Sequence, residues 1–173
     1  DDSNPELMKL VDFEKTLKEL LDKDFYIARS DYKPLCSQYY EIYNQFNTLK
    51  KSKTLDYYCS SNHIEIGRAE VFLSTFEDLM KDESAEIITA HNHAFIERHL
   101  VSDKHYLDNI LKQVDPVINL DDEQRMVVLS DEDYTLVIAG AGAGKTTTVA
   151  AKVKYLVEKK HINPEQILVI SFT

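Results

Sequence analysis

Hydrophobic residues in the first part of the chain recur at intervals of three and four residues, the spacing that places side chains on one face of an α-helix. One such run extends over residues 5–29, and polar residues and a proline at 30–34 interrupt it. A second run follows over residues 35–49. Two amphipathic segments joined by a short break predict an antiparallel pair of helices. Their apolar positions are Leu10, Phe13, Leu17, Leu20, Leu21, Phe25, Ala28, Leu35, Tyr39, Ile42, Phe46 and Leu49.

Three further helices are expected before residue 116, at about 62–81, 85–101 and 103–114. Ser102 is the expected N-cap of the last one, because its hydroxyl can accept a bond from the first turn. No run before residue 116 has the pattern of a strand. Pro116 marks a boundary, because the residue before a proline is disfavoured in helical conformation. We therefore expect an all-helical N-terminal region over residues 1–115.

The pattern changes after residue 116. A short helix is expected at about 121–130, a strand at the dense apolar run 134–139, a helix at 145–160 and a second strand at 167–170. Strand, helix and strand in this order predict a parallel βαβ unit and an α/β fold class. Two strands are too few to bury a sheet, so exposed edges or self-association are expected. The helix is expected to turn four apolar residues inward: Val149, Val153, Leu156 and Val157.

A glycine-rich loop separates the first expected strand from the following helix. It reads AGAGAGKT and matches the phosphate-binding pattern GxxxxGK[ST], except that Ala139 replaces the first glycine. Glycine lets the backbone curl closely enough for its N–H groups to surround the phosphates of a nucleotide. Lys145 would neutralise those phosphates and the Thr146 hydroxyl would ligate Mg²⁺, while the helix N-terminus attracts the same anion. The expected phosphate-binding residues are Ala139, Gly140, Ala141, Gly142, Ala143, Gly144, Lys145, Thr146 and Thr147.

The alternative for this loop is a glycine-rich turn without a ligand. That interpretation leaves unexplained why the loop lies between an apolar run of strand length and a helix, which is the setting that the phosphate-binding pattern requires.

Three strings around this loop resemble one family. LDDEQR at 120–125, LVIAGAGAGKTTT at 136–148 and ILVISFT at 167–173 are similar to the opening motifs of UvrD/Rep/PcrA-type superfamily-one DNA helicases. The resemblance covers about residues 118–173, and the region before it weakly resembles helicase IV-like members. It implies that residues 116–173 begin a RecA-like ATP-binding domain. The full-length protein would then be an enzyme, an ATP-dependent translocase that moves 3′ to 5′ along single-stranded DNA.

The resemblance also assigns roles to single residues. Gln124 matches the family's glutamine that binds adenine, and a carboxamide can pair with adenine N6 and N7. Alternatively, Asp121 and Gln124 fit a capping box at the start of a helix, and one side chain cannot fill both roles completely. Phe172 and Thr173 match the motif that contacts single-stranded DNA, where an aromatic ring stacks on a base. The alternative for Phe172 is a core position at a strand end.

The chain has a net charge of −10, and residues 1–115 carry −8 of it, from 14 basic and 22 acidic residues. An acidic surface repels phosphate backbones, so residues 1–115 are not expected to bind DNA by themselves. An acidic hairpin at 5–51 would suit a protein partner instead. The alternative function is accordingly an ATP-dependent remodelling factor that docks on RNA polymerase through the helical region.

Other classes are disfavoured. No apolar stretch is long enough to span a membrane, and two cysteines outside any CxxC motif indicate a reducing, cytoplasmic setting. His91 and His93 lie on different faces of a helix, which makes a zinc site there improbable. The carboxylate for Mg²⁺ and the arginine that hydrolysis needs come from later motifs in the family. We therefore expect these 173 residues alone not to unwind DNA.

Overall fold

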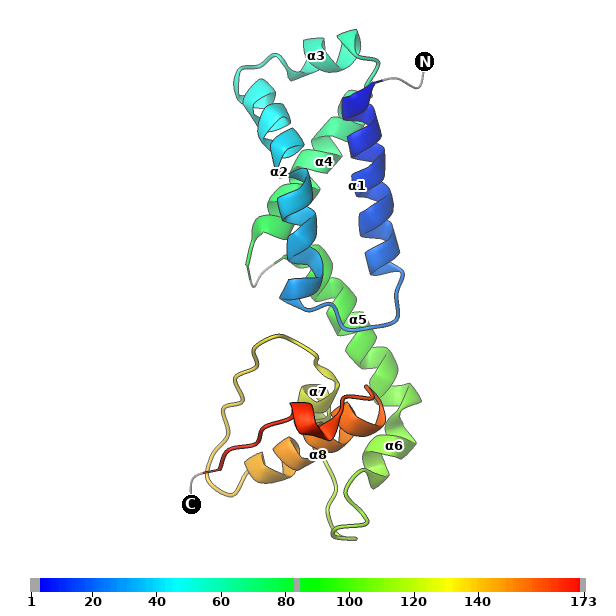
Figure 1. The fold of residues 1–173 in the computed structure, drawn as a ribbon, viewed down its shortest axis with the longest axis vertical. Coiled ribbons are helices and arrows are strands. Elements are labelled where there is room, and N and C mark those ends of the chain that lie inside the picture. Colours follow the sequence, from blue (N-terminus) through cyan, green and yellow to red (C-terminus); the bar gives the residue numbers. More distant parts are fainter. Residues whose placement is uncertain (1–3, 83–84, 172–173) are drawn as a thin grey trace. The chain divides into compact units, whose positions relative to one another are not determined.

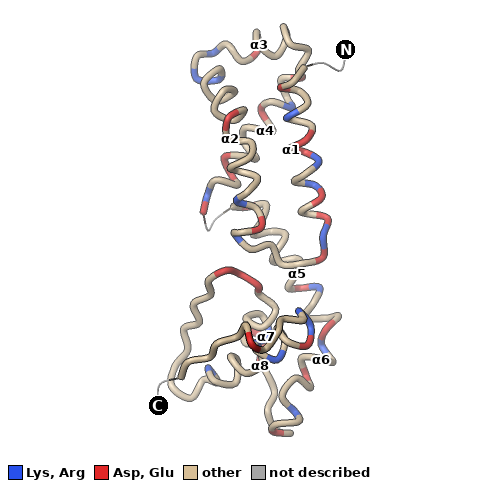
Figure 2. Tube along the Cα trace, in the orientation of Figure 1, with Lys and Arg blue, Asp and Glu red and all other residues tan. Residues whose placement is uncertain are grey.

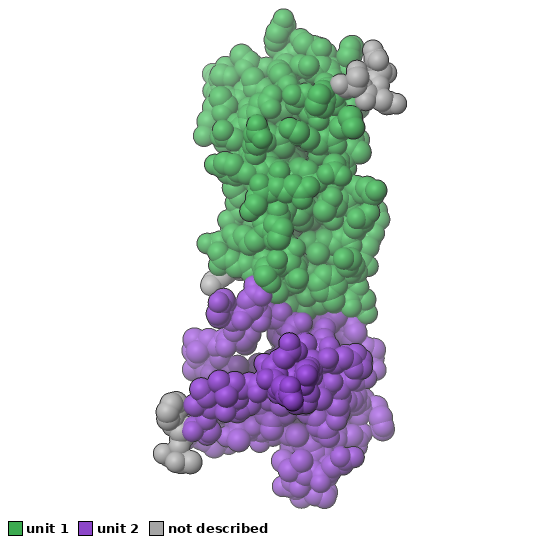
Figure 3. Space-filling model, in the orientation of Figure 1, with its two compact units in different colours: residues 1–93 green, residues 94–173 purple. Residues whose placement is uncertain are grey.

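A computed structural model describes residues 4–82 and 85–171 (Figure 1). The chain divides into two compact units, residues 1–93 and 94–173 (Figure 3), and the division falls within helix α5. In order, the elements are α1 (Pro5–Leu21), α2 (Arg29–Lys51), α3 (Leu55–Ser61), α4 (Ile66–Met80), α5 (Glu86–Ser102), α6 (Lys104–Asn109), α7 (Asp122–Leu129), α8 (Lys145–Glu158) and the 3-10 turn η1 (Pro164–Gln166).

Unit 1 is a helical bundle in which α2 packs against both α1 and α4. Its centre is aromatic: the rings of Phe13 and Phe72 meet edge to face at 4.9 Å, and Tyr43 stacks on Phe76 at 4.5 Å. These four side chains come from three helices, and such ring pairs contribute beyond the area that they bury. The helical periodicity of residues 5–49 therefore predicts the buried face correctly.

The link between α1 and α2 differs from the expectation. α1 ends at Leu21 and α2 begins at Arg29, so Phe25 lies between them and Pro34 lies inside α2. A buried amide on α5 fixes this link: Asn92 accepts from the Ile27 N–H at 2.8 Å and donates to the Ile27 carbonyl at 2.9 Å. Because both backbone groups of Ile27 are paired there, the link is stable without helical hydrogen bonds.

The outer face of α1 carries interleaved charges (Figure 2). Lys15 and Glu19 lie 4.0 Å apart, and Lys18 and Asp22 lie 2.5 Å apart, each pair one helical turn apart. Exposed pairs of this kind contribute little to stability. Within the described ranges, no helix is long and apolar enough to cross a bilayer.

The predicted α/β fold class is wrong, as the structure of unit 2 shows. Over the described residues the structure is helical and contains no strand. Residues 134–139 and 167–170 are extended but do not pair, and their apolar side chains face solvent: Leu136, Ile138 and Leu168 are 84%, 88% and 83% exposed. An extended segment keeps its backbone unpaired unless a neighbouring strand supplies partners, and a pair of short segments is too small a sheet to hold itself.

The core of unit 2 is instead built by its helices. It consists of Leu107, Ile110, Leu111, Leu120, Val128, Leu129, Ala151 and Tyr155. The face of α8 that is buried is consequently the one bearing Thr148, Ala151 and Tyr155. The expected inward face is only partly buried: Val149 is 47% exposed, whereas Val153, Leu156 and Val157 are half-buried. That expectation assumed a sheet for α8 to cover.

Candidate phosphate-binding loop

The loop at 139–144 joins the first extended segment to α8. A turn forms where the Ala143 N–H donates to the Gly140 carbonyl at 3.2 Å. Gly142 and Gly144 both have φ +77°, a left-handed conformation that residues with a Cβ rarely adopt. Two such residues within three positions produce the tight curl that the sequence predicts.

Lys145 is the first residue of α8 and is exposed. Its Nζ donates to the carbonyl of Ala139 at 3.1 Å, so the side chain lies back across the loop that precedes it. Thr146 is exposed on the same first turn and Thr147 is half-buried. The ammonium group, the helix N-terminus and the curled backbone are therefore close together, which is the donor set that a phosphate chain requires.

The carbonyl of Gly144 connects the loop to two helices. It accepts from the backbone N–H and from the hydroxyl of buried Thr148, both at 2.9 Å. The amide nitrogen of Gln124 faces the same oxygen at 3.5 Å, a long contact. A Cβ placed on Gly144 would lie 2.5 Å from that nitrogen. Gln124 of α7 thus packs directly against the end of the loop.

The capping box at the start of α7 is formed. The Asp121 carboxylate accepts from the Gln124 N–H, and the Gln124 carboxamide oxygen accepts from the Asp121 N–H, both at 2.9 Å. These reciprocal bonds satisfy two N–H groups at the helix start. The carboxamide oxygen is engaged in the cap, while the nitrogen points to the loop.

A buried arginine holds α7 from its other side. Arg125 donates to the carbonyl of Leu120 at 2.9 Å and to the Asn119 side chain at 3.1 Å, and it pairs with Asp108 of α6 at 2.7 Å. Hydrogen bonds from Lys104 and then Arg125 lower the pKa of the Asp108 carboxyl. The sequence places Arg125 next to Gln124 but gives no sign of this network.

Lys152 is a site residue that the sequence analysis missed. Its Nζ donates to the carbonyl of Val128 at 2.8 Å and to the carbonyl of Ser130, which ties α8 to the end of α7. Burial lowers its pKa to about 8, Asp131 opposes the shift and Lys160 adds to it. No motif in the sequence marks Lys152: it follows Thr148 by four residues, beside a face of α8 that the sequence did not predict to be buried.

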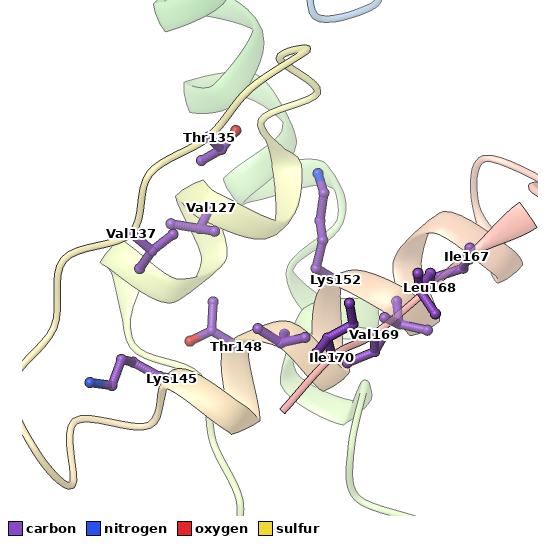
Figure 4. Close-up of a pocket in the computed structure, with 12 residues that line it drawn as sticks. Val127, Thr135, Val137, Lys145, Thr148, Lys152, Ile167, Leu168, Val169 and Ile170 are labelled. Carbon is purple, nitrogen blue, oxygen red and sulfur yellow. The ribbon is translucent and has the colours of Figure 1, made fainter. Parts of the chain in front are cut away.

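A cavity of about 440 Å³ lies beside the loop, bounded by α7, α8 and the two extended segments (Figure 4). Its walls are mainly apolar, with Val127, Val137 and Leu168 among them. Lys145 and Lys152 also border it and extend in different directions in Figure 4. Apolar walls do not suit a phosphate, so the expected phosphate position is the loop itself.

Two other kinds of ligand were considered from the sequence, metal ions and DNA. Within 4–82 and 85–171, no cluster of three or more His, Cys, Asp or Glu side chains could hold a metal ion. His91 bonds the Phe25 carbonyl and His99 bonds Asp103, each at 2.8 Å. Phe172 and Thr173, the expected DNA contacts, lie outside the described residues.

The same stretch that forms the loop matches a known protein family. Residues 120–173 match the UvrD/REP helicase N-terminal domain. A probable DNA helicase II homolog of Mycoplasma capricolum is 44% identical over 54 residues, which are 31% of this chain and 8% of that protein. The ATP-dependent DNA helicase srs2 of Schizosaccharomyces pombe is 44% identical over 54 residues, 31% of this chain and 6% of that protein.

A bacterial relative gives the same result. The ATP-dependent DNA helicase PcrA of Staphylococcus epidermidis is 40% identical over 57 residues, 33% of this chain and 8% of that protein. The chain therefore spans less than a tenth of the length of these relatives. A comparison with solved structures finds no match.

These matches identify residues 120–173 as a segment similar to DNA helicases. The matching family model and relatives are of the UvrD/Rep/PcrA type, as the three sequence strings predict.

Proposed function

We propose that residues 116–173 begin the ATP-binding domain of an ATP-dependent DNA helicase. The observation that carries the proposal is the left-handed glycine loop that ends in Lys145 at the start of α8, with Gln124 packed on it, inside the segment that matches the helicase family. Family membership supports ATP as the nucleotide, and the loop geometry supports the place where its phosphates bind.

Mg²⁺-ATP fits the residues present. Backbone N–H groups of the loop and of the first turn of α8 are donors for phosphate oxygens, and the Lys145 ammonium lies on the same turn. Thr146 is exposed there and offers the hydroxyl for the ion. Bound Mg²⁺ would neutralise charge on the phosphates, whereas the protein residues hold and orient the phosphate chain.

Adenine recognition by Gln124 requires an exchange of partners. The carboxamide nitrogen already faces the loop, but the oxygen must leave the Asp121 N–H before it can accept from adenine N6. The capping bond is one neutral hydrogen bond, worth about 1 kcal/mol net, so a bidentate contact with adenine can replace it.

Single-stranded DNA is the proposed polymer substrate of the complete protein, and Phe172 and Thr173 are the proposed contacts. The relatives are DNA helicases by name, which supports DNA as the substrate, and the proposed direction of movement is 3′ to 5′. The 173 residues alone are proposed not to unwind DNA, since they span less than a tenth of those relatives.

The test is ATP hydrolysis and strand displacement by the complete protein and its Lys145→Ala variant. Single-stranded DNA should stimulate hydrolysis, displacement should need a 3′ tail, and the variant should lose both activities. Lys154→Ala is the matched control, because Lys154 lies on the same helix and pairs with Glu158 at 3.6 Å, away from the loop. Hydrolysis that is equal in Lys145→Ala and wild type would refute the proposal.

A further inference from the structure

Two polar contacts join α7 to α8, one at each end of α7. At its start, the Gln124 amide faces the Gly144 carbonyl. At its end, Lys152 Nζ donates to the carbonyls of Val128 and Ser130. Between them lies an apolar contact that includes Val128 and Ala151. The same α7 therefore carries the proposed adenine contact at one end and a lysine attachment at the other.

The lysine attachment is chemically well suited to a helix end. The last carbonyls of a helix lack partners within the helix and carry its partial negative charge. An ammonium group has three donors, and Lys152 directs two bonds at such carbonyls. A methionine or leucine would pack here without the cost of burying an amine, so packing alone does not explain a lysine at this position.

The two contacts differ in strength. The Gln124 contact is 3.5 Å long and uses neutral groups, so it orients α7 only weakly. Both Lys152 bonds are charge-assisted, a class that is roughly twice as strong, and the bond to Val128 is 2.8 Å long. α7 has eight residues and is about 12 Å long, so a rigid helix transmits a displacement at its end to Gln124 at its start. Apolar contacts between the helices permit sliding that directional bonds do not.

We propose that Lys152 is a positioning residue for base selection: by tying the end of α7 to α8, it holds Gln124 at a fixed place beside the phosphate-binding loop. The inference rests on the proposed nucleotide function. The bonds of Lys152 go to the end of α7, whereas the phosphate donors belong to the loop and to the start of α8. Its loss should therefore weaken the discrimination between adenine and guanine while phosphate binding is retained.

The experiment measures Kd for Mg²⁺-ATP, Mg²⁺-GTP and Mg²⁺-tripolyphosphate on the full 173-residue chain. Variants are Lys152→Met, Lys152→Gln, Lys152→Arg and Gln124→Ala. Lys160→Met is the matched control, because Lys160 lies near Asp131 at 3.9 Å and over the Tyr155 ring at 6.0 Å, as part of the same charged group, but is not bonded to α7 carbonyls. The ratio of the ATP and GTP constants is the deciding quantity. A partly unfolded variant raises both constants by the same factor and leaves their ratio unchanged.

Lys152→Met and Lys152→Gln should each reduce the preference for ATP at least about fivefold, the smallest effect expected from losing a bidentate base contact. Lys152→Arg should retain most of the wild-type preference for ATP, and Lys160→Met should leave that preference unchanged. The double variant Lys152→Met/Gln124→Ala should be no worse than Gln124→Ala alone, because both act through one contact. Tripolyphosphate binding should change less than about twofold throughout, a difference of about 0.4 kcal/mol.

A wild-type preference for ATP that survives in Lys152→Met and Lys152→Gln would overturn the inference and leave the nucleotide function intact. Equal loss in Lys160→Met, or additive loss in the double variant, would also overturn it. If wild type binds tripolyphosphate but does not prefer ATP to GTP, both the adenine role of Gln124 and this inference fail. If wild type binds none of the three ligands, the proposed function fails, together with the adenine role of Gln124 and this inference.

Discussion

Gly144 shows how much a single residue determines in this site. Its φ of +77° excludes most side chains, its carbonyl accepts two bonds from Thr148, and its open Cα face is filled by the Gln124 amide. Gly142 has the same φ, but a Cβ there would meet nothing within 4 Å. Substitutions at the two glycines therefore distinguish the effect of backbone strain, present at both, from the effect of a side-chain contact, present at Gly144 alone.

Gly144→Ala should lower the unfolding free energy by about 1–3 kcal/mol because of left-handed strain, and it should also displace the Gln124 amide. Gly142→Ala is the control and should show the strain alone. Chemical denaturation measures the first effect and the ratio of ATP to GTP affinity measures the second. The same ATP preference in both variants would contradict the contact between Gly144 and Gln124.

Lys152 should make stability depend on pH in a known direction. Its pKa is about 8 in the folded protein and 10.5 ordinarily, so between these values the unfolded chain binds more protons. Rising pH then favours the folded state, and Lys152 should increase stability from about pH 8 to pH 10. Burial raises the pKa of Tyr155 to about 12, so above pH 10 the unfolded chain loses that proton first and stability should fall.

Urea unfolding at pH 7 and pH 9.5 checks this for wild type and Lys152→Met. The increase in the free energy of unfolding from pH 7 to pH 9.5 should be smaller in Lys152→Met than in wild type. An equal gain in both proteins would show that Lys152 is not the group responsible.

At the scale of elements, α7 depends on its first residues because it has only eight. Short helices are marginal by themselves, and the Asp121 capping box satisfies N–H groups that would otherwise lack partners. The helical elements were largely predictable from sequence, since helical hydrogen bonds are local. The apolar stripe records the buried face of α1 and α2 but not that of α8. The Asp121 and Gln124 spacing likewise predicts a cap that the structure forms.

Asp121→Ala should destabilise unit 2 by about 1 kcal/mol through loss of the cap. Asp122→Ala is the control: Asp122 lies in the first turn and acts only on the helix dipole, an effect of about 0.3–1 kcal/mol. Hydrogen exchange of the α7 amides should show the larger loss of protection in Asp121→Ala. If both variants lose the same protection, the cap is not what stabilises α7.

At the scale of the whole molecule, the sequence predicted most helices but missed α3, and it wrongly predicted strands at the extended segments. Residues 134–139 and 167–170 have the composition of buried strands, yet a strand is defined by partners that a sequence pattern does not contain. The same reason explains why Lys152 was missed. Its partners are backbone carbonyls of another helix, which no side-chain motif records. The glycine loop was found because its requirements are local.

The exposed apolar side chains of these segments predict concentration-dependent self-association of the 173-residue chain. Replacing Ile138 and Leu168, which are 88% and 83% exposed, with lysine should shift the population toward monomer. Tyr57→Lys is the control, since Tyr57 is 79% exposed on α3 in the other unit. Light scattering over a concentration series measures the masses, and unchanged association in the double variant would exclude these segments as the cause.

The most direct test of the proposed nucleotide site is equilibrium binding of a fluorescent ATP analogue with Mg²⁺ to the wild-type chain and to Lys145→Ala. We predict saturable binding to wild type that unlabelled ATP displaces, and a loss of affinity of at least about tenfold in the variant, as expected for removing a charged hydrogen-bonding group from a phosphate. Equal affinity in the two proteins would contradict the claim that this loop binds a nucleotide through Lys145.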